Sequence, residues 1–198
     1  IARQLRDTVL GKKIAFVQAA QSPHGFGWYC GDPEQYPDLL VGKQITDAYP
    51  VAGLVEVEAE DVHIVFNDGV NIRFLGQGEA LPKKHQLYLR FEDDSCIVCT
   101  VQMYGGMMAF PEGSYGNPYY LVARERPSPL SDAFSPRHFQ AIVEEGGPKL
   151  SVKALLATEQ RIPGLGNGCL QDILWNARVN PQSKVGMLPD GDLDAVFQ

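Results

Sequence analysis

The sequence predicts an α+β protein in two domains: an N-terminal antiparallel β-sandwich with a flanking helix, followed by an all-α domain. Between 54 and 110, short alternating apolar runs succeed one another, as in a sandwich or flattened barrel. Beyond 136 the apolar residues recur at helical spacing. The segment RERPSPLS separates the two patterns, so we expect a first domain at 1–125 and a second at 126–198.

Composition narrows the class of protein. The chain has 198 residues, of which 44% are hydrophobic and 21% charged, as in an ordinary globular protein. No apolar run approaches the roughly 20 residues that span a bilayer, so we expect no membrane-spanning segment. The start at Ile1 has no signal-peptide pattern, so we expect no secretory signal. A formal net charge of −7 argues against a simple nucleic-acid binder, although the field at the binding face is what counts.

The cysteines do not form the framework of a disulfide-rich protein. Cys96 and Cys99 lie in SCIVCTV, which is typical of a strand. Residues three apart on a strand point to opposite faces, so this pair is poorly placed to hold one metal ion. We therefore expect packed, reduced thiols, an intracellular compartment and no metal site.

The first domain begins with a helix at 1–10, because Ile1, Leu5 and Val9 share one face and Gly11 ends the pattern. A strand at 12–20 and an ordered aromatic loop at 21–37 follow. The segments VLGKKIAF and LLVGKQI resemble each other, which we interpret as two β starts.

Alternation then predicts the remaining strands. The run 62–66 alternates, and Asp68-Gly69 is a strong hairpin signal before VNIRFL. The run 87–91 alternates as well, and a turn at 92–94 leads into the next strand.

The helical part contains a hairpin of two helices. Helices are predicted at 136–145, 152–160, 167–179 and 193–198. Ser151 is an N-cap candidate for the second, and Pro163 with its neighbouring glycines ends it before Asn167 opens the third. The loop between them presents backbone amides at a helix N-terminus, which suits a phosphate. An ordinary helical hairpin with a glycine-rich turn is the alternative.

The segment 151–181, SVKALLATEQRIPGLGNGCLQDILWNARVNP, resembles the helix–two-turns–helix of the formamidopyrimidine-DNA glycosylase / endonuclease VIII family. Lys153 and Asn167 occupy the places of the family's phosphate-binding Lys and Asn. PSPLSDAFSPRHF at 127–139 resembles its linker and the following helix. The resemblance implies double-stranded damaged DNA as partner, bound by a monomer between the two domains.

The family attacks C1′ of the damaged nucleotide with the amine of an N-terminal Pro, assisted by a Glu, after flipping the base. Here the first residues resemble the helix that follows that start, so no catalytic residue is assigned. The family's intercalating arginine corresponds to Gln102 or Met103. Tyr104 could act as an aromatic wedge or could be a strand-end tyrosine packed on Met103 and Met107.

Other candidate DNA contacts are implied by position. Lys84 and His85 fall near a phosphate-contacting segment of the family, although a lone His there is more typical of a solvated strand end. Arg161 and Gly166 belong to the glycine loop, and Asn167 could serve both as an N-cap and as a phosphate ligand. The family often ends in a zinc finger with two C-x-x-C pairs. No second pair occurs here, so we expect no cofactor in this chain and a structural zinc only with a finger beyond it.

Three hypotheses follow. The first is a base-excision-repair DNA glycosylase with AP-lyase activity. The second is a non-catalytic homologue that recognises damaged or distorted DNA, which the altered wedge residues favour. The third is an acidic β-domain that binds a protein or small ligand, with a purely structural hairpin. A steep salt dependence of DNA binding separates the first two from the third.

Overall fold

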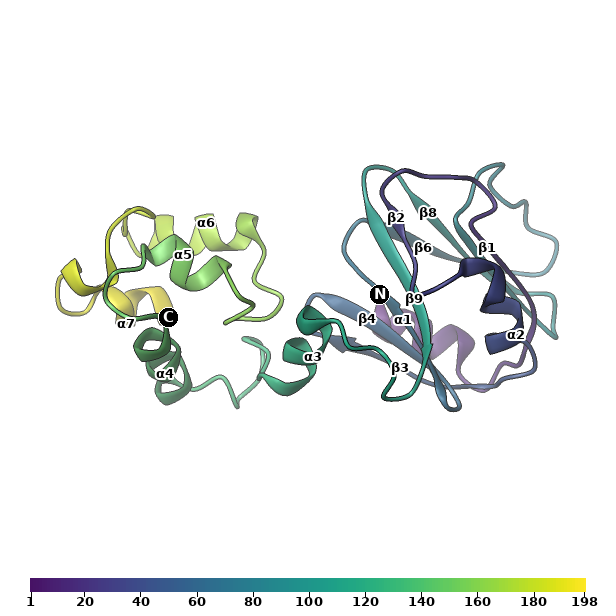
Figure 1. Ribbon diagram of the computed structural model, residues 1–198, viewed down its shortest axis with the longest axis horizontal. Coiled ribbons are helices and arrows are strands. Elements are labelled where there is room, and N and C mark those ends of the chain that lie inside the picture. The colour runs from purple at the N-terminus through teal and green to yellow at the C-terminus, as the bar shows by residue number, and fades with distance from the viewer. The chain divides into compact units, whose positions relative to one another are not determined.

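The computed structural model describes residues 1–198 and divides into two compact units, Ile1–Gly116 and Asn117–Gln198 (Figure 1). The division precedes α3 (Pro118–Glu125), a helix that the sequence analysis did not predict. Asn117 caps this helix by accepting the Tyr119 amide at 3.0 Å, and Pro118 is its first residue. The same Asn-Pro pair is typical of a loop, which is why its helix signal was missed.

The first unit contains two sheets that share one apolar core. Its strands are β1 (Ile14–Ala19), β2 (Gly27–Trp28), β3 (Ile45–Val51), β4 (Leu54–Ala59), β5 (Val62–Phe66), β6 (Val70–Leu75), β7 (Leu87–Phe91), β8 (Cys96–Val101) and β9 (Gly105–Pro111). The sheet orders are β1-β7-β8-β6 and β2-β9-β5-β4-β3. All pairs are antiparallel except β2 with β9, so the second sheet is mixed. The predicted α+β class and two-sheet arrangement are confirmed.

The core of this unit follows the predicted alternation. On β7, Leu87, Leu89 and Phe91 are fully buried, whereas the residues between them are half-exposed. The flanking helix α1 (Ala2–Val9) adds Leu5 and Val9 to the same core, as its i, i+4 spacing predicts.

The predicted hairpin at Asp68-Gly69 is wrong. β5 pairs with β4 and β9, whereas β6 pairs with β8 in the other sheet. All five residues of β5 are buried, and the strand occupies the centre of the five-stranded sheet, so both its edges already have partners. The turn is present, with Gly69 at φ +91°, but it carries the chain from one sheet to the other.

The two similar Gly-Lys segments lie side by side. The amides of Gly11 and Ile14 donate to Ile45 and Lys43, and the amides of Gly42 and Ile45 donate to Ile14 and Lys12, all at 2.8–2.9 Å. Both segments lead into strands, β1 and β3, so the interpretation as two β starts is confirmed.

The segment 21–37 is more structured than a loop. It contains β2, a 3₁₀ turn at Pro33–Gln35 and the start of helix α2 (Tyr36–Leu40). Tyr36 is buried, and its hydroxyl accepts the amides of Cys30 and Ala109 at 2.9 and 3.0 Å while donating to the Met107 carbonyl at 2.9 Å. This hydroxyl therefore satisfies backbone groups of β9 where the short β2 does not reach.

The second unit is helical. Its further helices are α4 (Pro136–Gly146), α5 (Val152–Ala157), α6 (Asn167–Asn176) and α7 (Asp192–Phe197), with a 3₁₀ turn at Val185–Met187. α5 is shorter than predicted because Glu159 and Gln160 adopt positive φ, at 57° and 50°, which no α-helix contains. α6 likewise ends before the predicted Val179. One apolar cluster joins α4, α5, α6 and α7. None of the helices is both long enough and apolar enough to span a bilayer.

Candidate nucleic-acid interface

The helical hairpin begins as the sequence predicts. The Ser151 hydroxyl accepts the Ala154 amide at 3.1 Å and caps α5. Val152 and Leu155 are buried in the helical core, whereas Lys153 between them is exposed. The Lys153 amide donates to the Pro181 carbonyl at 3.0 Å, which fixes the first turn of α5 against the chain that follows α6. The ammonium group of Lys153 is thus free to meet an anion.

Asn167 is the first residue of α6, and Gly166 rather than Asn167 is the N-cap. The prediction of an Asn167 cap is therefore wrong, because the extended residue at the helix start, with φ −78° and ψ 158°, is the glycine. The first intrahelical bond runs from the Leu170 amide to the Gly166 carbonyl at 3.0 Å. The side chain of Asn167 makes no cap bond and is exposed, together with Gly168 and Cys169. Exposed amides and a free carboxamide thus lie at the positive end of α6.

Arg161 is buried in the loop before α6, with 5% of its surface exposed. Its guanidinium donates to the Thr158 hydroxyl at 3.0 Å and pairs with Glu159, while Nε lies 3.9 Å from Glu145 of α4. Arg126 donates to both carboxylate oxygens of Glu145, at 3.1 and 3.2 Å. A phosphate contact by Arg161 would require it to leave these partners. In this structure the side chain orders the loop instead.

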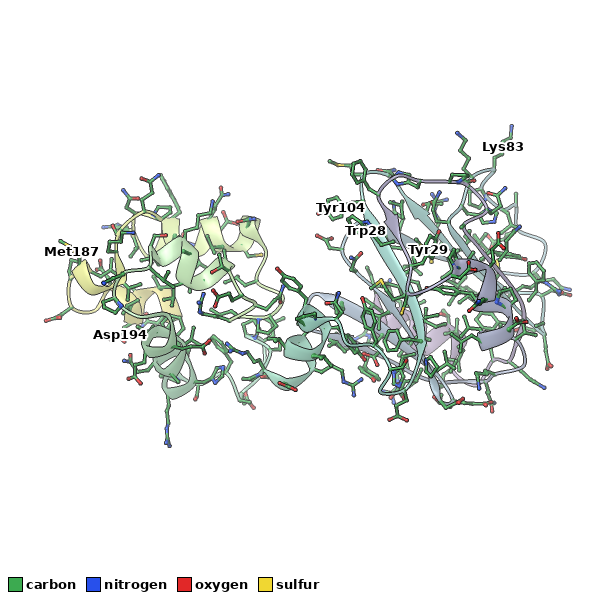
Figure 2. All side chains as sticks on the ribbon, in the orientation of Figure 1. Trp28, Tyr29, Lys83, Tyr104, Met187 and Asp194 are labelled. Carbon is green, nitrogen blue, oxygen red and sulfur yellow. The ribbon has the colours of Figure 1, made fainter.

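On the β unit, the predicted wedge residues form the connection between β8 and β9. Gln102 is exposed, and Met103 and Tyr104 expose 76% and 43% of their surfaces. The Tyr104 ring lies beside Trp28, at 6.3 Å between ring centroids (Figure 2). Trp28 is itself 46% exposed and was not among the predicted site residues.

The tight turn between β5 and β6 packs against this connection. The Asn67 side chain accepts the Gly106 amide, and a Cβ on Gly69 would overlap the Tyr104 carbonyl. Only a glycine therefore fits between β5 and β6 at this point, for reasons of both space and positive φ.

We expect Gly69→Ala to lower the free energy of unfolding more than Gly113→Ala does. Gly113 also has positive φ, 73°, but has open space around its Cβ position. Its substitution should cost about 1–2 kcal/mol through φ alone. Gly69→Ala must in addition displace the Tyr104 backbone, so its urea midpoint should be clearly lower. Equal midpoints for the two variants would contradict the close approach.

Lys84 and His85 lie just before β7. Lys84 is exposed, but His85 is buried, with Nδ1 3.2 Å from the Pro82 carbonyl and Nε2 without a hydrogen-bond partner. The prediction of a solvated histidine is wrong, because the His85 ring packs edge-on against Tyr88. Of the two predicted residues only Lys84 offers an exposed charge. Its neighbour Lys83 is exposed as well (Figure 2).

The sequence analysis missed a cluster of metal-ligand types on β4 and β5. Ligand atoms of Glu56, Glu58 and His63 lie within 4.8 Å of one another. The Tyr49 hydroxyl lies 2.6 Å from Glu58 and 3.0 Å from Glu56, and His63 Nδ1 contacts Glu56. Burial, together with the two carboxylates, raises the pKa of Tyr49. The sequence feature that could have revealed this cluster is the Glu-x-Glu alternation on β4, with His63 opposite Glu58 across the β4–β5 turn. Each group already has a hydrogen-bond partner within the cluster.

All four cysteines are free, but only Cys96 and Cys99 are packed in the interior. Cys96 and Cys99 are buried on β8, and burial raises the pKa of both thiols. Cys169 is exposed at the start of α6.

Comparison with known proteins gives a consistent result. No protein-family model matches the chain. Formamidopyrimidine-DNA glycosylase of Lactococcus lactis is 22% identical over 198 residues, which cover 98% of this chain and 70% of the relative. The enzyme of the same name from Brevibacillus brevis is 26% identical, and the match covers 98% of this chain and 69% of the relative. A third, from Deinococcus radiodurans, is 35% identical over 78 residues, or 39% of this chain and 26% of the relative.

Solved structures share the fold. The complex of Lactococcus lactis Fpg with abasic-site DNA has a TM-score of 0.79 at 21% identity, covering 99% of this chain and 71% of that one. MutM in complex with DNA containing carbocyclic 8-oxo-G has the same score and identity and covers 99% and 73%. The sequence similarity and the shared fold both extend over nearly the whole chain, so this protein is similar to formamidopyrimidine-DNA glycosylases and has the fold of their solved structures.

Proposed function

We propose that the protein is a DNA glycosylase of base excision repair that acts on double-stranded damaged DNA. The observation that carries the proposal is the exposed start of α6, where Asn167 and unpaired amides face solvent beside a loop ordered by Arg161. Such a helix start binds a phosphate oxygen through oriented N–H groups. The names and DNA complexes of the relatives support the same activity.

Lys153 would hold a second charge-assisted contact to the DNA backbone. Its exposed ammonium group and the N-terminal end of the α6 dipole are both positive, although the formal net charge of the chain is −7. Contacts of this kind position a duplex without reading its sequence. The selection of a lesion would then come from the residues that meet the interrupted base stack.

The finer proposal is that a terminal amine attacks C1′ of the damaged nucleotide, that the base departs as the glycosidic bond breaks, and that the sugar ring opens to give an imine. Loss of a C2′ proton then expels the 3′ phosphate by β-elimination, which cleaves the strand. This route uses an amine and a carboxylate and draws on no cofactor. A second candidate is a homologue that recognises damaged DNA without cutting it. It is favoured by the resemblance, in which the family's intercalating arginine corresponds to Gln102 or Met103, neither of which is charged.

The experiment uses the gene product with its native N-terminus, a duplex with one abasic site, and borohydride. A covalent protein–DNA adduct is expected and would support the lyase route. Binding without an adduct, falling steeply with salt, would favour the non-catalytic homologue. Absence of both adduct and binding would overturn both candidates.

A further inference from the structure

Four large apolar side chains are exposed together at one end of the β unit. Phe26 and Trp28 come from the β2 segment, and Met103 and Tyr104 come from the β8–β9 connection. They expose 63%, 46%, 76% and 43% of their surfaces. We call them the aromatic patch. Contiguous exposed apolar groups on a folded protein usually mark a binding surface.

The two halves of the patch are held together by backbone pairing. β2 runs parallel to β9, with Gly27 opposite Gly105 and Trp28 opposite Gly106. The Gly105 amide donates to the Phe26 carbonyl at 2.9 Å. Gly105 has no room for a side chain, since a Cβ would lie 2.7 Å from Val70. The backbone that carries the patch is therefore fixed before any ligand arrives.

The rings are ordered by each other and still open to solvent. Trp28 and Tyr104 are 6.3 Å apart between centroids with an interplanar angle of 35° (Figure 2). This is within the range of favourable aromatic pairs, so each ring restricts the other's rotation. About half of each ring nevertheless remains exposed, which suits stacking on a further flat ring.

The surroundings supply positive charge for a polyanion. The Ser22 amide donates to the His85 carbonyl at 3.0 Å, and the Gln86 side chain donates to the Ser22 carbonyl at 3.1 Å. These bonds join the segment before β2 to the connection that carries Lys83 and Lys84, which are both exposed. The segment that leads into the patch is thus bonded to the segment that carries these two lysines, whose charges would attract a polyanion. Aromatic side chains combined with positive charge on one domain are typical of proteins that bind unstacked nucleobases with their phosphates.

We propose that Trp28, assisted by Phe26, is a stacking site for a nucleobase that has lost its neighbour or partner at an interruption of the duplex. The proposal rests on the proposed function and extends the site beyond Gln102, Met103 and Tyr104. Trp28 would hold the unpaired base against its indole face, while Tyr104 enters the stack. Preference for interrupted over intact duplex would then come in part from the β2 segment.

The test exploits the two tryptophans of the chain. Trp175 is 83% exposed on α6, so Trp175→Phe should leave the fold intact and make Trp28 the only indole reporter. The probes are a duplex with one tetrahydrofuran abasic analogue and the intact duplex of the same sequence. We expect quenching of Trp28 fluorescence by the first and much less by the second.

Affinity measurements by fluorescence anisotropy of labelled DNA complete the test. Trp28→Ala should weaken binding to the interrupted duplex by about 5- to 150-fold, which corresponds to the loss of one stacked base. Binding to intact duplex should change little, and Trp28→Phe should retain most of the preference. Trp175→Ala is the matched control and should behave like the parent.

Each other outcome has a clear meaning. Normal, salt-sensitive DNA binding with unchanged fluorescence and no effect of Trp28→Ala would overturn this proposal and leave the proposed function standing. Absence of DNA binding in the parent would remove both. Self-association that Trp28→Ala abolishes would identify the patch as a protein contact instead and would also overturn the proposal.

Discussion

Replacing Lys153 with alanine is expected to weaken DNA binding by about tenfold or more and to reduce the salt dependence. Its exposed ammonium group would neutralise one phosphate, so the slope of log K against log salt should become shallower by about 0.9. Lys149→Ala is the matched control, because Lys149 is also exposed on the helical unit but lies outside the hairpin. Titrations at several salt concentrations distinguish the two variants.

Asn167→Ala should weaken binding to a similar extent with an unchanged salt slope. The carboxamide is neutral, and its loss removes a hydrogen bond to a charged group, about 1.5–3 kcal/mol. Because the Asn167 side chain makes no cap bond, thermal unfolding should stay near that of the parent. Unchanged affinity in both variants, with unchanged melting, would remove the phosphate site from the hairpin.

Tyr36→Phe should cause a large loss of stability in the β unit. The substitution leaves two amides and one carbonyl without the buried hydroxyl that now serves them. At roughly 1 kcal/mol for each hydrogen bond, we expect a decrease of about 3 kcal/mol in the free energy of unfolding. Urea unfolding measures it. Tyr88→Phe is the control, because the half-buried Tyr88 forms no hydrogen bond through its hydroxyl, and it should change stability little.

The same tyrosine should make stability fall at alkaline pH. Burial raises the pKa of Tyr36 from 10.0 to about 12. Between these values the unfolded chain loses the proton while the folded chain keeps it, so unfolding is favoured as pH rises. The loss is about 1.4 kcal/mol for each unit of pKa shift, complete near pH 12. Tyr36→Phe lacks this component, so the stability gap between parent and variant should narrow from pH 9 to pH 12. A constant gap would contradict the raised pKa.

Local sequence patterns correctly predicted those helices and strands whose formation depends mainly on residues within the same segment. Ser151 caps α5 because its hydroxyl reaches an amide three residues on, and this requires nothing from the rest of the chain. The 87–91 strand followed from simple alternation, since one face meets the core and the other does not.

Sequence patterns gave a wrong prediction where contacts with residues distant in the sequence determine the structure. Asp68-Gly69 forms a turn, but whether the next strand pairs with β5 depends on β4 and β9 already occupying its edges. His85 is a different case: its ring packs edge-on against Tyr88, only three residues on, and the polar Lys-His-Gln sequence does not reveal this burial.

The candidate site shows the same division. Lys153 and Asn167 could be proposed as phosphate ligands from the sequence because a short contiguous motif carries them. Trp28 was missed because it is brought to Tyr104 by a parallel pairing of two residues between segments almost eighty positions apart in sequence. No local signal specifies such a pair, and the exposed fraction of an aromatic side chain is a property of the folded chain.

The reciprocal bonds between the two Gly-Lys segments have a mechanical consequence. β1 is an outer strand of one sheet and β3 an outer strand of the other, so these bonds form a short seam between the sheets where the two strands begin. Sliding the sheets past each other would break directional hydrogen bonds as well as apolar contacts. At the seam neither strand offers a free row of amides and carbonyls, which removes that stretch as a template for edge-to-edge aggregation.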